Sequence, residues 1–302
     1  MRLGVVVANQ GATVARVEQE LVWAEDLGFD SAWMPGIPNG PDVLTLIAVA
    51  GRATSRIELG PAVLPVHPRH PTALASQALT THDAVGGRLT LGLGASHQRV
   101  IEGQLGLDYH RPVRYVDEYL RVLVPLLEEQ QVDVRGEVLR TSFRLEATDG
   151  ARPAPTVFLA ALGPRMLELA GAATTGAATW LVGPRTLEEV TVPTLAKAAA
   201  AAGRQEPRVL VRLPFLLPED EAAGRAVAAA EFDRYARLPV YAAVLQQEGV
   251  EQASALAQIG DERALAAAFG RFRDLGVTDL QLTTFGDAAA QARTLEFAAS
   301  LR

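Results

Sequence analysis

Short apolar runs alternate along most of the chain with amphipathic segments of helical length. The runs are rich in Val and Leu, which is typical of strands buried in a parallel sheet. We expect strands over Leu3–Ala8, Asp30–Met34, Ile57–Leu64, Arg88–Leu93, Thr156–Ala161, Ala177–Val182, Arg208–Leu217 and Asp279–Thr283. We expect helices over Thr13–Leu27, Asp42–Ala53, Thr72–Val85, Val113–Glu128, Pro164–Ala173, Leu187–Ala202, Glu219–Leu238, Val240–Glu248, Glu262–Leu275 and Ala288–Leu301.

Eight strands alternating with helices predict an α/β fold with a parallel sheet, and the length of the chain fits a (β/α)8 TIM barrel. An open doubly wound sheet is the alternative, but no strand–GxGxxG–helix unit opens the chain. We expect one domain over residues 1–302, with insertions at about 98–152 and 218–260. The first contains a hairpin over Val132–Leu145, and the second is a helical segment between strands seven and eight. Such long connections are typical of lids or binding loops.

Composition narrows the function classes. The chain has 302 residues, a net charge of −7 and a single lysine, Lys197, so it offers no basic patch for nucleic acid. It has no cysteine, which excludes disulfides, thiolate chemistry and iron–sulfur clusters. No apolar run approaches the ~20 residues of a membrane span, and the first residues lack the features of a secretory signal. We therefore expect a soluble, cytoplasmic protein with no membrane or nucleic-acid partner.

Polar groups gather in the loops after two predicted strands. All five histidines lie between His67 and His110: two flank the Pro-rich turn LPVHPRHP, and His97 closes the loop LGLGASH. In a (β/α)8 barrel, loops that follow strands build the active site. The mid-helix His82 is better interpreted as a packing residue.

Two segments rich in small residues are candidates for anion binding. Gly92–His97 offers backbone N–H groups with little side-chain bulk, and Ala160–Arg165 ends a strand just before a helix. A tight turn that merely needs glycine is the alternative interpretation of the first. A third segment, LGPAVLP, suits a strand end whose backbone presses against a ligand.

The segment GPAVLPVHPRHPTALASQALTTHDAVGGRLTLGLGASH (Gly60–His97) resembles the central signature of the luciferase-like flavin monooxygenase superfamily. Three further segments are similar to its branch that uses the deazaflavin coenzyme F420: Val100–Leu123, Val157–Gly171 and Thr179–Glu189. The resemblance covers most of the chain and is strongest between Gly60 and Gly183.

The resemblance implies a barrel with an isoalloxazine-like ring at its C-terminal mouth. It places a non-prolyl cis peptide at Ala62–Val63, behind the ring. It implies that the cofactor phosphate is held by Gly94, Ala95 and Ser96 on one side and by Ala161, Leu162 and Gly163 on the other. Ala160 is a further cofactor-binding candidate, next to Ala161.

The chain departs from that branch just after the second strand. Many relatives carry Asp-His or a similar polar pair there, whereas this chain has Trp33-Met34-Pro35-Gly36-Ile37. If the reaction needs a proton carrier, His97 is the first candidate and His67 the second, because histidine titrates near neutral pH. The alternative for His97 is a hydrogen bond to the loop backbone. Trp33 and Trp180 are interpreted as core or ring-lining residues, and Arg165 as a surface arginine or a contact for the acidic tail of the coenzyme.

We therefore expect an oxidoreductase that uses coenzyme F420 for hydride transfer to or from a small, mainly apolar organic substrate. The alternatives are an FMN-dependent monooxygenase or flavin reductase, and a non-catalytic flavin-binding homologue. Other barrel enzymes fit less well: Lys197 lies on a helix, the first strand supplies no metal ligands, and Ser96-His97 lacks a G-x-S-x-G elbow. We expect no metal site, and we expect a homodimer.

Overall fold

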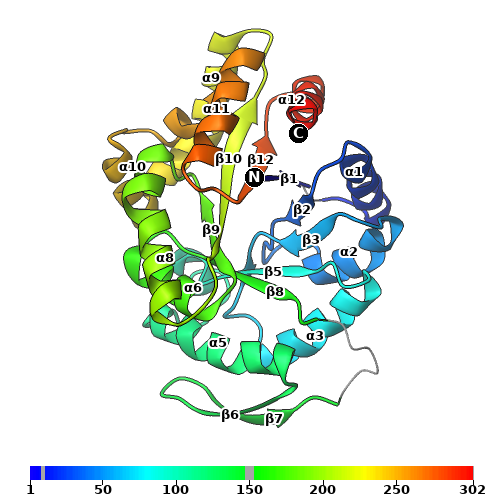
Figure 1. Cartoon of the computed structure of the whole chain (residues 1–302), viewed down its shortest axis with the longest axis vertical. Coiled ribbons are helices and arrows are strands. Elements are labelled where there is room, and N and C mark those ends of the chain that lie inside the picture. Colours follow the sequence, from blue (N-terminus) through cyan, green and yellow to red (C-terminus); the bar gives the residue numbers. More distant parts are fainter. Residues whose placement is uncertain (8–10, 147–152, 302) are drawn as a thin grey trace. The chain divides into compact units, whose positions relative to one another are not determined.

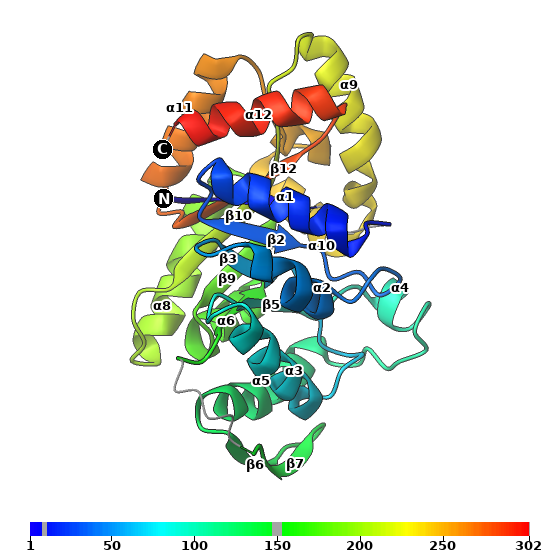
Figure 2. The same cartoon turned by 90° about the vertical axis from the view of Figure 1, so that its right-hand side faces the viewer.

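The computed structural model describes residues 1–7, 11–146 and 153–301 (Figures 1 and 2). Its contacts divide the chain into two compact units. The N-terminal unit consists of Val7–Trp23 and Ala32–Ala160. The C-terminal unit consists of Met1–Val6, Ala24–Ser31 and Ala161–Arg302. Each unit is built from parallel strands and helices, as the alternating pattern predicts. The expectation of a single domain stays a prediction.

In the N-terminal unit, β5 (Thr90–Gly94) lies between β4 (Leu64–Pro65) and β8 (Thr156–Ala160), and it pairs with both in parallel. The other strands are β2 (Ser31–Met34), whose first residue is grouped with the other unit, and β3 (Glu58–Pro61). Its helices are α1 (Val14–Asp26), which ends in the other unit, α2 (Val43–Ala50), the 3-10 turn η1 (Gly51–Ala53), α3 (Pro71–Ala84), α4 (Gln98–Ile101) and α5 (Pro112–Glu128).

Local chemistry sets the beginnings of several of these helices. The Asp42 carboxylate accepts a hydrogen bond from the Thr45 N–H at 2.8 Å and so caps α2. Both α3 and α5 begin with a proline, whose fixed φ and missing N–H suit the first helical position.

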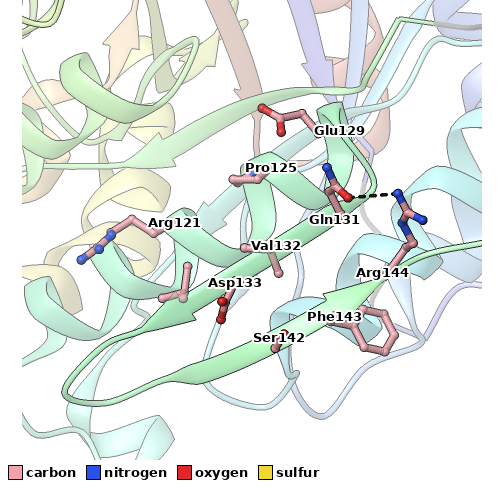
Figure 3. Close-up of a pocket in the computed structure, with 10 residues that line it drawn as sticks. Arg121, Pro125, Glu129, Gln131, Val132, Asp133, Ser142, Phe143 and Arg144 are labelled. Atoms are coloured by element: carbon pink, nitrogen blue, oxygen red, sulfur yellow. Dashed lines mark hydrogen bonds between the residues drawn. The ribbon is translucent and has the colours of Figure 1, made fainter.

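The hairpin predicted over Val132–Leu145 is confirmed as the antiparallel pair β6 (Gln131–Arg135) and β7 (Arg140–Arg144). It lies beside α5 (Figure 1). Between the hairpin and α5 is a groove of about 690 Å³ (Figure 3). Its lining mixes the exposed charged side chains Arg121 and Asp133 with Phe143, and Gln131 accepts a hydrogen bond from Arg144 at its rim. This groove lies away from the ends of the parallel strands, so we place the candidate site elsewhere.

In the C-terminal unit the strand order is β1 (Arg2–Val6), β12 (Asp279–Thr284), β10 (Arg208–Leu216) and β9 (Gly176–Trp180), all parallel. The short β11 (Gln258–Ile259) adds to the end of β10. The helices and turns are α6 (Pro164–Ala173), α7 (Pro184–Thr186), the π-helical turn η2 (Leu187–Thr191), α8 (Val192–Ala201), α9 (Glu221–Phe232), η3 (Asp233–Arg237), α10 (Pro239–Glu248), η4 (Ala253–Leu256), α11 (Glu262–Asp274) and α12 (Ala288–Ser300). Figure 2 shows α12 beside β12.

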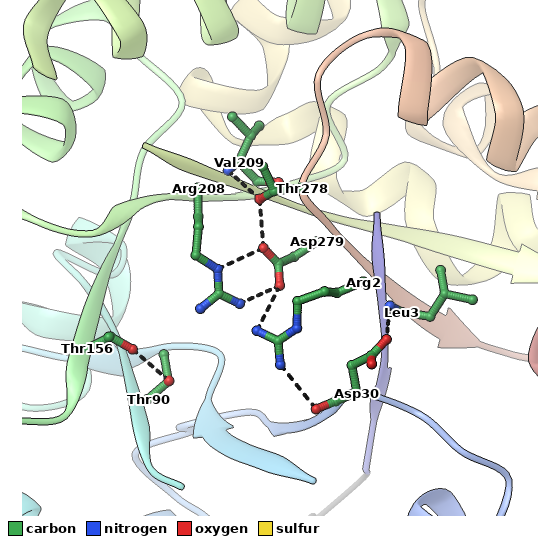
Figure 4. A network of polar contacts seen from close by, with 9 residues as sticks. All are labelled: Arg2, Leu3, Asp30, Thr90, Thr156, Arg208, Val209, Thr278 and Asp279. Atoms are coloured by element: carbon green, nitrogen blue, oxygen red, sulfur yellow. Dashed lines mark hydrogen bonds and ion pairs between the residues drawn. The ribbon is translucent and has the colours of Figure 1, made fainter. Parts of the chain in front are cut away.

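Asp279, the first residue of β12, joins the beginnings of three strands (Figure 4). Its carboxylate, 2% exposed, accepts two hydrogen bonds from Arg208 and one from the Thr278 hydroxyl, and it forms an ion pair with Arg2. Arg2 and Arg208 begin β1 and β10, so one carboxylate fixes the starts of three neighbouring strands of this unit. Figure 4 also draws a hydrogen bond of the N-terminal unit, between Thr90 and Thr156.

The strands and helices agree closely with the predicted ones, and the differences are local. The strand expected over Ile57–Leu64 is divided into β3 and β4 by a cis peptide bond. The helix expected over Leu187–Ala202 begins with a π-helical turn, and the helical insertion before the last strand also contains β11. Ala8, the predicted end of the first strand, and residues 147–152 of the first predicted insertion lie outside the described residues. Within the described residues, no helix is long and apolar enough to span a membrane.

Candidate functional site

The segment after β3 turns through a cis peptide bond between Ala62 and Val63, at the position that the resemblance implies. The Ala62 N–H donates to the Met34 carbonyl at 2.8 Å, which joins this turn to the end of β2. The turn packs closely on β5: a Cβ at Gly92 would lie 2.2 Å from the Pro61 carbonyl oxygen. A Cβ at Gly94 would lie 2.9 Å from a methyl group of Val63 and 3.0 Å from Ala160 Cβ.

These close approaches correct the interpretation of Gly92–His97 as a loop. Gly92 and Gly94 belong to β5, and they lack side chains because the turn at Pro61–Val63 occupies that space. The Gly94 carbonyl also accepts a hydrogen bond from the Val66 N–H. The loop that remains for an anion is therefore the short segment from residue 95 to residue 97.

The same turn fills the space beside Gly36, in the segment after β2 where this chain lacks the expected polar pair. A Cβ at Gly36 would lie 2.6 Å from the Val63 carbonyl oxygen and 3.0 Å from Leu64 Cα. Trp33 and Met34 are 1% and 0% exposed, and the Trp33 ring meets the Phe158 ring edge-on at 6.1 Å. Trp33 is therefore a core residue, and this segment offers no titratable group.

The loop after β5 presents hydrogen-bond donors on small residues. The backbone N–H groups of Ala95 and Ser96 donate to no other group in the described parts of the chain. Ser96 has φ of 63°, in the left-handed region that residues with a Cβ rarely adopt. Its carbonyl accepts a hydrogen bond from the Tyr109 hydroxyl at 2.8 Å. Adjacent backbone donors in a left-handed turn are a common way to bind an anionic oxygen.

Of the five histidines, the two predicted as proton carriers lie at or beside this loop. His97 follows Ser96 as the N-cap residue of α4 and is partly buried; burial lowers its pKa, so its imidazole is neutral at neutral pH. His67 stacks on Tyr115, with centroids 4.4 Å apart and planes 8° apart. Burial also lowers the pKa of His67, and the nearby Ala95 backbone and Asp108 only partly oppose that shift. Neither ring nitrogen of His67 makes a hydrogen bond within the described residues.

The other three histidines have structural or surface positions. His82 is 6% exposed, and its Nε2 bonds to the Pro153 carbonyl at 2.9 Å, which confirms it as a packing residue. The His70 side chain caps the beginning of α3 through the Thr72 N–H. His110 is exposed. The clustering of histidines in the sequence therefore overstates their number at the site.

In the C-terminal unit, the segment Ala161–Gly163 comes before α6. The Ala161 N–H donates to the Ala178 carbonyl at 3.1 Å and is therefore occupied. The N–H groups of Leu162 and Gly163 make no hydrogen bond in the described parts of the chain. A Cβ at Gly163 would meet no atom within 4 Å, so the approach to these donors is open. Arg165 is exposed on α6.

Sequence analysis did not predict an aromatic and cationic cluster that lies in the same unit. The Arg212 guanidinium lies 4.7 Å from the Trp180 ring centroid, and its Nε donates to the Thr283 hydroxyl at 2.7 Å. Burial lowers the pKa of Arg212 to about 10. Two rings of the helical insertion, Phe232 and Tyr235, meet Trp180 edge-on at 6.0 and 5.9 Å. The sequence feature that could have indicated this cluster is the charged Arg212 within an apolar strand.

The profile of the luciferase-like monooxygenase family matches residues 1–293. The chain belongs to this family. A relative from Methanolobus tindarius, 5,10-methylenetetrahydromethanopterin reductase, is 29% identical over 209 residues, or 69% of this chain and 63% of that protein. The chain thus matches less than two thirds of the length of that reductase.

Solved structures of similar proteins confirm the predicted fold, a (β/α)8 barrel with a helical insertion before its last strand. The coenzyme F420-dependent tetrahydromethanopterin reductase of Methanopyrus kandleri superposes with a TM-score of 0.82 at 21% identity, over 99% of this chain and 97% of that one. A type II Baeyer–Villiger monooxygenase of Pseudomonas putida, in complex with FMN, has a TM-score of 0.76 at 17% identity, over 99% and 96%. Proteins similar to this chain therefore include both F420-dependent and FMN-binding enzymes.

Among the described residues, no group of three or more His, Asp and Glu side chains could hold a metal ion.

Proposed function

We propose that this protein is an oxidoreductase that uses coenzyme F420 to transfer a hydride to or from a small, mainly apolar organic substrate. The observation that carries the proposal is the pair of backbone N–H donors at Ala95 and Ser96, which make no hydrogen bond within the described residues, in a chain that is similar to an F420-dependent reductase. FMN is the alternative cofactor, because the family includes flavin monooxygenases.

The residues present fit a phosphate-bearing cofactor. In the N-terminal unit, Ala95 and Ser96 would hold the phosphate through backbone N–H groups, next to Gly94 at the end of β5. Ala62 and Val63 would support the ring, since both remain partly exposed at the turn after β3. As a separate proposal for the C-terminal unit, Leu162 and Gly163 would donate to a cofactor phosphate, with Ala161 beside them. Ala160, the last residue of β8 in the N-terminal unit, stays a proposed cofactor-binding residue.

A bound deazaflavin would supply the hydride chemistry, while the protein supplies binding, orientation and proton transfer. His97 is our candidate for the proton carrier. Because burial holds its imidazole in the neutral form at neutral pH, it is suited to accept a proton from a substrate hydroxyl. His67 is the second candidate, although its stack on Tyr115 gives it a packing role as well.

We also propose that the helical insertion shapes the substrate pocket, and that the protein acts on small molecules as a homodimer in the cytoplasm. The aromatic side chains of Phe232, Tyr235 and Tyr241 in this insertion favour an apolar substrate. The absence of a polar group after β2 favours the alternative of a non-catalytic flavin-binding homologue.

Parallel binding titrations with coenzyme F420 and FMN, followed by cofactor fluorescence, test the proposal. Tight binding of F420 with weak binding of FMN supports it, and turnover with reduced or oxidised F420 then removes the non-catalytic alternative. Preference for FMN moves the function to a monooxygenase or flavin reductase. If the protein binds neither cofactor, the assignment of the loop after β5 as the phosphate-binding site is refuted.

A further inference from the structure

Tyr109 has a place in the proposed cofactor site that the sequence did not indicate. Its hydroxyl donates to the Ser96 carbonyl at 2.8 Å, across a separation of 13 residues. Ser96 is the residue in the left-handed region, a conformation that needs support from its surroundings in any residue with a side chain. The hydrogen bond therefore falls on the least favoured backbone conformation in the loop.

An aromatic stack holds the Tyr109 ring. The ring of His67 lies between Tyr109, at 5.2 Å, and Tyr115, at 4.4 Å. Tyr115 lies 6.1 Å from the ring of Tyr119, which is fully buried in α5. The stack thus extends from a rigid helix to the loop after β5. Burial raises the pKa of Tyr109, so its hydroxyl stays protonated and remains a donor through neutral pH.

We infer that Tyr109 is a positioning residue for the cofactor phosphate, an inference that rests on the proposed function. The Ser96 carbonyl belongs to the peptide plane between Ser96 and His97, and a planar peptide turns as one body. Holding this carbonyl fixes ψ of Ser96 and the left-handed turn that carries the N–H donors of Ala95 and Ser96. Tyr109 itself touches neither the reacting atoms nor the phosphate in this role.

The test compares ligands with and without the phosphate on the same variants. The Tyr109→Phe variant keeps the ring and its stack but removes the hydroxyl. The matched control is Tyr115→Phe, the same change in the same stack, where the hydroxyl makes no hydrogen bond within the described residues. Each protein is titrated with F420 and with its phosphate-free deazaflavin riboside, and with FMN and riboflavin.

We expect Tyr109→Phe to weaken binding of the preferred phosphate-bearing cofactor roughly threefold to tenfold, the size of one hydrogen bond, and to leave its phosphate-free counterpart within about twofold. Tyr115→Phe should leave the ratio of the two affinities at its wild-type value. The ratio is measured within one variant, so a general loss of folded protein does not imitate the effect.

Each other outcome overturns the inference. If Tyr109→Phe keeps the wild-type ratio, or weakens both ligands equally, Tyr109 supports the fold and not the phosphate. If Tyr115→Phe changes the ratio as much as Tyr109→Phe does, the hydroxyl bond to Ser96 is not the cause. If the wild-type protein binds the cofactor and the variants give either of these results, the inference alone is refuted. Wild-type protein that binds neither F420 nor FMN refutes the proposed function together with it.

Discussion

Glu118 offers the sharpest test of how this structure is stabilised. Its carboxylate lies on α5, is 1% exposed, and accepts three backbone hydrogen bonds from the turn between β6 and β7. The donors are the N–H groups of Glu137, Val138 and Leu139, at 3.0, 2.7 and 2.8 Å. One buried carboxylate thus closes the turn of a hairpin whose strands are otherwise largely exposed.

The substitution Glu118→Gln preserves the shape of the side chain and removes the charge. Its amide oxygen can keep the two bonds that Oε2 accepts, but its NH₂ group then faces the Glu137 N–H, donor against donor. The expected cost is therefore about one charge-assisted hydrogen bond, about 1.5–3 kcal/mol. Because the strands of the hairpin are largely exposed, we expect the hairpin to open locally, and this cost should appear as such opening.

Amide hydrogen exchange of peptides that cover β6 and β7 measures this opening. In the limit where exchange reports the opening equilibrium, the cost corresponds to exchange roughly 10-fold to 150-fold faster in Glu118→Gln than in wild type. The matched control is Glu137→Gln, the same change in the same turn. Glu137 is exposed, and its ion pairs with Arg111 and Arg114 contribute little. Equal exchange in the two variants would refute the reasoning.

The pH dependence of the hairpin provides a second check on Glu118. Burial raises the pKa of this carboxyl, but the N–H groups of Leu139, Val138 and Glu137, aided by Arg114, outweigh burial, so its pKa is lowered. A carboxyl with a lowered folded pKa stabilises the structure above its unfolded pKa, near 4.5, and this stabilisation is lost as pH falls through the folded value. Hairpin exchange should therefore quicken below about pH 4.5 in wild type, relative to intrinsic rates, and stay insensitive in Glu118→Gln.

Three further predictions follow from the described contacts. In the cofactor-loaded enzyme, His97→Gln should lower kcat about 100-fold or more. It should also remove an acid limb of the pH–rate profile, which lies below pH 6.5 because burial lowers the pKa of His97. An unchanged profile would exclude His97 as the proton carrier. Gly94→Ala should destabilise the protein by about 1–3 kcal/mol in urea unfolding, because the new methyl would overlap Val63 and Ala160; unchanged stability would show that the turn after β3 yields easily. Asp279→Asn should lower the free energy of unfolding by about 3 kcal/mol in the same assay, because it leaves the Arg208 guanidinium without its buried counter-charge. An unchanged free energy of unfolding would mean that water replaces the carboxylate.

Sequence periodicity predicted the elements well because each depends on residues near one another in the chain. The helix expected over Pro164–Ala173 is α6 itself, since a proline at its start and small apolar residues at helical spacing are local signals. The cis peptide at Ala62–Val63 was found through the resemblance and not through any pattern in the residues.

What the sequence did not reveal depends on contacts between distant segments. Gly92 and Gly94 were interpreted as loop glycines, whereas their small size is required by Pro61 and Val63, about thirty positions earlier. Glu118 on an amphipathic helix would ordinarily be assigned to solvent, and only the folded hairpin turns it inward. The bond from Tyr109 to Ser96 spans the short helix α4 and the irregular segment after it, where no hydrophobic periodicity indicates the contact.

The turn at Ala62–Val63 also bears on where proton transfer can occur. Because Val63 and Leu64 fill the space beside Gly36, a side chain cannot be added at that position without moving their backbone. Position 36, in the segment after β2, is therefore closed to a side chain, for a steric reason that originates in the turn after β3. At later strand ends of the same unit, His67 follows β4 after one residue, and His97 follows β5 after Ala95 and Ser96. A proton carrier in the N-terminal unit is thus best sought in the loop that also offers the anion donors, and substitution at His97 tests this choice directly.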